Sequence, residues 1–139
     1  MTNLISHQEI VNAPIEKVWD HLIYKIEHPQ YFVPNVEEVE VLEKKASYTI
    51  RKMKLKMPDQ TLFIVEKITW STHQVRFEIT EHPTLEGFVD NFVEAITNES
   101  TLLTYKMNWQ NKITKSSANN LDILKSAVLK SKNFIEDKS

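Results

Sequence analysis

Four polar residues lie among apolar side chains on the predicted strands of this chain. Arg51, Glu66, Asn91 and Tyr105 each share a strand face with apolar neighbours, because successive residues of a strand point to opposite sides. A mostly apolar wall with a few polar groups is the usual composition of a small-molecule pocket. The four residues are therefore candidate ligand contacts, although Arg51 and Glu66 also fit an internal ion pair, and Asn91 and Tyr105 also fit partners for backbone groups.

His7 and Glu9 form a second group that could do chemistry, since they lie on one face of the first predicted strand. An imidazole beside a carboxylate can act as an acid and a base, and Glu66 in an apolar cavity is a third candidate, as a general base. Apolar residues on both faces of the first strand leave its inward face open, and a lone strand histidine usually has a structural role. We therefore assign none of the three a catalytic role from the sequence.

The positions of these residues depend on a run of strands joined by short turns. Strands are predicted over 4–12, 36–43, 48–57, 61–70, 74–80, 87–97 and 101–111. Most turns between them have the length and residue types of hairpins, which predicts an antiparallel meander. In 61–70 both faces are partly apolar, and the more apolar set, which includes Glu66, is taken as inward. Alternation adds apolar candidates to the ligand wall, namely Met53, Leu55 and Phe77. In 87–97 both faces are apolar, so alternation leaves the inward face of that strand open.

Helical segments are predicted on both sides of the strand run. A short amphipathic helix follows Pro14, with Asn12 as a possible N-cap and Pro29 just past its end. Residues 116–137 have apolar residues three, four and seven apart, which predicts a helix with one buried face. Residues 29–33, held between two prolines, are predicted to form a short second helix or turn and to act as a lid over the pocket. These segments supply the remaining candidate ligand contacts, namely Tyr31, Phe32, Leu124 and Val128.

Composition excludes several classes of function. The chain holds 17 basic and 19 acidic side chains, a net charge of -2. Without an excess of basic side chains to attract phosphate groups, we expect no nucleic-acid partner. Without cysteine there is no disulfide or thiolate site, and a single glycine rules out glycine-rich phosphate loops. His21 and His28 lie about 10 Å apart along a helix, too far to share a metal ion. We therefore expect no metal site.

The chain is expected to form a single domain over residues 1–139, because no repeat or linker divides it. It has no signal peptide pattern and no run of about 18 apolar residues, so we expect no membrane insertion. The absence of cysteine fits a reducing compartment, which makes the cytoplasm the expected location. A monomer or a weak homodimer is the expected assembly.

The predicted elements are, in order, one strand, two helical pieces, six strands and a final helix, and residues 9–19 form the first strand-to-helix junction. This order and this junction resemble the START-like or SRPBCC superfamily. Pro29, residues 32–34, 40–43 and 87–92 resemble more narrowly its AtaL-like branch. The resemblance implies an α+β helix-grip (Bet v 1-like) fold, a curved antiparallel seven-stranded sheet (β-α-α-β6-α) wrapped around a C-terminal helix. Helix-grip relatives often have an inward polar residue on the strand 87–97, which implies that Asn91 and, with it, Val93 face the pocket. The superfamily includes lipid and sterol carriers and polyketide cyclases, so the fold does not select an activity.

The leading hypothesis is binding or carriage of a small hydrophobic ligand, lipid-, sterol- or polyketide-like, whose polar end Arg51 and Glu66 would orient. The alternatives are a cyclase or hydrolase-like enzyme that uses a buried carboxylate, and a protein-interaction module marked by exposed Phe63 or Phe92. No nucleophile or cofactor motif is present, so we rank binding above catalysis and expect no cofactor. Glu66→Gln should change ligand affinity modestly, abolish turnover, or have no effect in the three cases.

Overall fold

The computed structural model describes residues 4–32, 35–56 and 58–137 of the 139-residue chain. These residues form a succession of strands with one α-helix near each end and a short 3-10 helix. In chain order the elements are β1 (Ile5–Val11), α1 (Ile15–Glu27), η1 (Pro29–Tyr31), β2 (Val36–Lys44), β3 (Tyr48–Lys56), β4 (Thr61–Ser71), β5 (Gln74–Glu81), β6 (Leu85–Thr97), β7 (Ser100–Asn111) and α2 (Leu121–Asp137). The strand limits agree with the predicted ones within about two residues, and Met57 lies outside the described residues.

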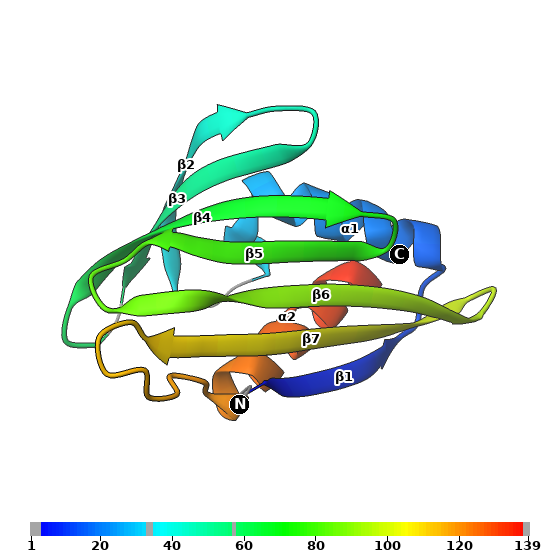
Figure 1. Cartoon of the computed structure of the whole chain (residues 1–139). Helices are drawn as coiled ribbons and strands as arrows, with labels where there is room; N and C mark the ends of the chain where they lie inside the picture. The colour runs from blue at the N-terminus through cyan, green and yellow to red at the C-terminus, as the bar shows by residue number, and fades with distance from the viewer. Residues whose placement is uncertain (1–3, 33–34, 57, 138–139) are drawn as a thin grey trace.

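The strands form one antiparallel sheet in the order β1-β7-β6-β5-β4-β3-β2. From β2 to β7 each strand pairs with the next in the chain, and β1 returns to pair with β7. Figure 1 shows the sheet curving, with α1 and α2 on the same side of it. The predicted helix-grip fold is confirmed.

Helix α1 forms because its apolar residues follow a helical period. Val18, Leu22 and Ile26 are buried on one face of the helix. Pro14 occupies the N-cap position and offers no side-chain hydrogen bond, so the prediction of Asn12 as the N-cap is wrong. The backbone N–H of Asn12 instead donates to the Glu136 carboxylate at 2.8 Å, which ties the start of α1 to the end of α2.

Helix α2 begins at Leu121 rather than at Ser116, where the sequence predicted its start. The segment between them runs along β7, where the N–H of Ala118 donates to the carbonyl oxygen of Trp109 at 2.9 Å. Asn120 Oδ1 then accepts a backbone N–H of the first helical turn at 3.1 Å, as an N-cap side chain does. The helical spacing of the apolar residues was predicted correctly. The residues before Asn120 are not helical because their backbone pairs with β7.

Gly87 on β6 has a φ of 123°, a conformation that side-chain-bearing residues rarely adopt. A Cβ atom at this position would overlap the carbonyl oxygen of Asn108 on β7. Gly87→Ala is therefore expected to lower the free energy of unfolding by about 2–3 kcal/mol. Urea unfolding checks this, with Glu94→Ala at an exposed position of β6 as the control. An unchanged midpoint for Gly87→Ala would contradict the expectation.

Buried apolar side chains between the sheet and the helices fall into two groups. The larger group joins α1 and α2 to the central strands, and includes Leu22, Leu103 and Val128. The smaller group is centred on Met53 and Ile64 of β3 and β4. Members of both groups line the cavity described next.

Candidate functional site

A cavity of about 420 Å³ lies between the sheet and the two helices. Its wall takes side chains from α1, from strands β3 to β7 and from the first two turns of α2, and most of them are apolar. The predicted ligand contacts in this wall are Arg51, Met53, Leu55, Glu66, Phe77, Asn91, Tyr105 and Leu124. Strand alternation therefore brings residues from five strands to one space.

The other predicted contacts, Tyr31, Phe32, Val93 and Val128, are not among the residues that line the cavity. Phe32 is fully buried, and its ring lies edge-on to that of Phe134 on α2 with 4.8 Å between ring centres. The Tyr31 ring stacks on the same Phe134 at 5.4 Å. Packing against α2 thus takes both aromatic rings away from the pocket wall, and the remaining two residues belong to the larger core group. Residue 33 of the expected lid, 29–33, lies outside the described residues.

His7 and Glu9 also lie apart from the cavity lining. They are on the edge strand β1, half-buried, with 2.6 Å between His7 Nε2 and Glu9 Oε2. Their strand partners on β7 are Tyr105 and Leu103. The two side chains pair with each other on the same face of the sheet as Tyr105 and Leu103, and neither of them lines the cavity.

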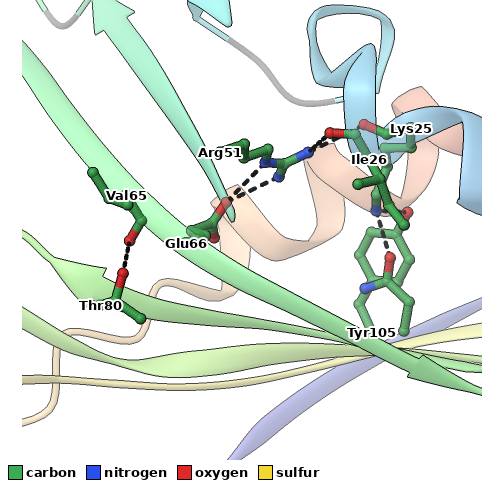
Figure 2. A network of polar contacts seen from close by, with 8 residues as sticks. Lys25, Ile26, Arg51, Val65, Glu66, Thr80 and Tyr105 are labelled. Atoms are coloured by element: carbon green, nitrogen blue, oxygen red, sulfur yellow. Dashed lines mark hydrogen bonds and ion pairs between the residues drawn. The ribbon is translucent and has the colours of Figure 1, made fainter. Parts of the chain in front are cut away.

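Arg51 and Glu66 form a buried ion pair in the cavity wall, because the register of β3 and β4 places them directly opposite each other. Arg51 Nη2 donates to Glu66 Oε1 at 2.9 Å, and Arg51 Nε donates to the same oxygen at 3.3 Å. Arg51 Nη1 donates to the carbonyl oxygens of Lys25 and Ile26 at 3.1 and 2.8 Å (Figure 2). Arg51 therefore joins the sheet to the C-terminal end of α1, where carbonyl groups lack helical partners.

Lys25 was not among the ligand contacts predicted from the sequence, nor was Trp109 in the same wall. The lysine is fully buried on α1, and its Nζ donates to Asn91 Oδ1 and, at 2.9 Å, to the Tyr105 hydroxyl (Figure 2). The rings of Tyr105 and Phe77 lie against it, with 4.4 and 4.7 Å from Nζ to the ring centres. Burial lowers the pKa of the Lys25 ammonium well below its usual value, Arg51 lowers it further, and Glu66 opposes both.

The spacing of α1 contained a signal for Lys25. Val18, Leu22 and Lys25 are four and three residues apart, which puts the lysine on the apolar face of the helix. A lysine on such a face usually extends its amine to solvent, so the sequence pattern alone did not mark it as buried.

The polar groups around Lys25 continue across the cavity wall. The Tyr105 hydroxyl lies 2.6 Å from Ser131 Oγ on α2, and burial raises the pKa of Tyr105, so the side chain is a phenol at neutral pH. Asn91 Nδ2 and the indole Nε1 of Trp109 are buried donors without a partner among the described residues. Both side chains line the cavity.

Residues 6–133 match the model of the family described as acetylaranotin biosynthesis cluster protein L, AtaL. The chain belongs to the AtaL family. No curated protein matches it. Within the described ranges no group of three His, Asp or Glu side chains could hold a metal ion, and no helix is long and apolar enough to cross a membrane.

Solved structures resemble this AtaL family member in fold. The Zhui aromatase/cyclase from Streptomyces sp. R1128 has a TM-score of 0.80 and 15% identity, with 99% of this chain and 96% of that chain covered. A START superfamily protein from Mycobacterium smegmatis has a TM-score of 0.75 and 12% identity, with 98% and 99% covered. At these identities the likeness establishes the START-like fold and leaves the activity open.

Proposed function

We propose that this AtaL family member binds a small hydrophobic ligand in the cavity between the sheet and the helices. The volume falls within the range of about 300–1,000 Å³ that is usual for small-molecule sites. Apolar side chains such as Met53, Phe77 and Met107 supply the area against which a hydrophobic body would be buried. Arg51 and Glu66 pair with each other, and Arg51 also donates to two backbone carbonyl oxygens. They therefore form part of the cavity wall and leave little free charge to bind a charged ligand.

The unpartnered donors of Asn91 and Trp109 carry the proposal. Buried N–H groups in proteins almost always have an acceptor, because an unpaired one costs about 1–3 kcal/mol. Asn91 Nδ2 and Trp109 Nε1 both belong to the cavity wall and lack a protein acceptor among the described residues. A ligand with an apolar body and hydrogen-bond-accepting oxygens would complement this wall and these donors.

Native mass spectrometry of the protein purified gently from its own cells is the first test. The expected result is a released compound of defined mass with an apolar body and at least one oxygen. Isothermal titration calorimetry with 2-naphthalenemethanol, a two-ring probe with one hydroxyl, gives an independent measurement. Binding of neither a cellular compound nor this probe would contradict the proposed function.

Filling the cavity should remove binding. Ala127 on α2 lines the cavity, so Ala127→Phe is expected to weaken 2-naphthalenemethanol binding by about tenfold or more. Lys125→Phe introduces the same side chain at an exposed position of α2 and serves as the matched control. Equal affinities of the two variants in calorimetry would place the probe outside this cavity.

Cyclisation of a bound polyketide-like compound is the second candidate function. It is favoured by the position of the Glu66 carboxylate in the cavity wall, and the Zhui aromatase/cyclase has a similar fold. A cyclase converts its ligand, whereas a carrier returns it unchanged. Incubating the compound released in native mass spectrometry with fresh protein, and analysing it by chromatography, distinguishes the two.

A further inference from the structure

The amine of Lys25 is enclosed by the protein and lines the cavity. Lys25 has 3% of its surface exposed, and its Nζ is held between Asn91 on β6 and Tyr105 on β7. A buried lysine amine beside an apolar cavity is the setting in which lysine acts as a nucleophile toward carbonyl compounds.

The hydrogen bonds of Lys25 fit a neutral amine. Such an amine has two N–H groups and one lone pair, and its two hydrogen-bond acceptors are Asn91 Oδ1 and the Tyr105 hydroxyl. An ammonium would have a third N–H, for which the described residues give no further hydrogen bond to a side chain. In the neutral form the lone pair remains free to react.

The charges that face Lys25 come from several elements. Arg51 on β3 and burial both favour the neutral amine, whereas Glu66 on β4 favours the ammonium. The rings of Phe77 and Tyr105 also attract a cation. Burial and Arg51 prevail, so the pKa of Lys25 is lowered and the amine is more available than an exposed one at neutral pH.

We propose that Lys25 forms a reversible imine with a hydrophobic aldehyde or ketone held in the cavity. This inference rests on the proposed function and narrows its ligand to a carbonyl compound. The carbonyl oxygen would accept a hydrogen bond from Asn91 Nδ2, and it would lie near the amine because Asn91 Oδ1 accepts a hydrogen bond from Lys25 Nζ.

The reaction needs no oxidant, reductant or cofactor. The Lys25 lone pair forms a bond to the carbonyl carbon, the carbonyl π pair moves to oxygen, and a proton passes from nitrogen to that oxygen. The carbinolamine then loses water, as the C–O bond breaks and the nitrogen lone pair forms the C=N bond. A second proton leaves nitrogen with the water, so amine and carbonyl give imine and water.

Reductive trapping tests the imine. The protein is incubated with 2-naphthaldehyde and sodium cyanoborohydride at neutral pH, and the modified residue is located by peptide mass spectrometry. We expect one naphthylmethyl group on Lys25, formed about tenfold or more faster than on any exposed lysine, because exposed amines are almost fully protonated. Lys25→Met should lose this adduct. Ala127→Phe keeps the lysine but fills the cavity, so it should also lose the adduct.

The outcomes separate this inference from the proposed function. If 2-naphthalenemethanol binds but 2-naphthaldehyde labels Lys25 no faster than exposed lysines, the imine is overturned and ligand binding stands. If neither probe binds and native mass spectrometry releases no cellular compound, both proposals fail. An adduct on Lys25 that persists in Ala127→Phe would also overturn the inference, since the carbonyl compound would not enter through the cavity.

Discussion

Arg51→Met is expected to lower the free energy of unfolding by about 3–5 kcal/mol, because it leaves the Glu66 carboxylate buried without its counter-charge. Arg51 and Glu66 are only 1% and 4% exposed, so water does little to replace the lost partner. The variant also removes the two N–H donors that reach the carbonyl oxygens of Lys25 and Ile26 at the end of α1. The effect therefore combines an unpaired charge with the loss of two hydrogen bonds at the end of the helix.

Urea unfolding at neutral pH measures this loss. In the double variant Arg51→Met/Glu66→Gln no charge remains unpaired, so part of the lost stability should return. Lys44→Met breaks the exposed pair of Lys44 and Glu27 and is expected to cost at most about 1 kcal/mol. Simple addition of the Arg51→Met and Glu66→Gln effects in the double variant would show that the pair does not interact as described.

This ion pair changes how Glu66 should be tested. Glu66→Gln alone leaves Arg51 buried without its carboxylate, so a loss of activity could arise from a weakened fold. When the ligand affinity or turnover of Glu66→Gln is compared with that of wild type, the free energy of unfolding of both proteins must therefore be measured as well. The double variant supplies a background in which the carboxylate is absent and the charges balance.

Lys25 should make the stability of the protein rise with pH in the alkaline range. The pKa of Lys25 is lowered in the folded state, whereas in the unfolded chain it is near its ordinary value of about 10.4. Between these two pKa values the unfolded state binds one proton more than the folded state, so raising the pH favours folding. The contribution should approach about 1.4 kcal/mol per pH unit and should end near the unfolded pKa.

Comparison with Lys25→Met isolates this contribution. The variant loses donors to Asn91 and Tyr105, which shifts its stability by an amount that depends little on pH. Urea unfolding of both proteins from pH 7 to 9 should show wild type gaining on Lys25→Met, with Lys125→Met controlling for loss of one exposed lysine. Parallel profiles of wild type and Lys25→Met would contradict a lowered pKa.

Much of the fold was predictable because it depends on local patterns. Alternation along 48–57 and 101–111 fixed which faces of two strands turn inward, and short turns left few alternatives to a meander. The start of α2 was predicted too early because the backbone bonds of residues 116–118 to β7 leave no trace in hydrophobic periodicity. Helix period and helix start are thus set by different interactions.

The site was harder to predict than the fold. Strand alternation placed Arg51 and Glu66 in one wall and the family resemblance added Asn91, but the contribution of Lys25 required knowing how deeply that face of α1 packs against the sheet. Phe32 was expected at the pocket as part of a lid segment between two prolines, yet its ring packs against that of Phe134, more than a hundred residues away. Contacts between helices and sheet decide such positions, and a single sequence does not specify them.

Trp109 gives this cavity a built-in optical reporter. Its indole lines the cavity, and its Nε1–H has no acceptor among the described residues. The backbone N–H of Trp109 donates to Asn119 Oδ1 at 2.7 Å, which holds the residue in place. Trp19 and Trp70 are absent from that wall, so an occupant would change the surroundings of one indole of the three. Filling and emptying of the pocket can therefore be followed through the emission of the unlabelled protein.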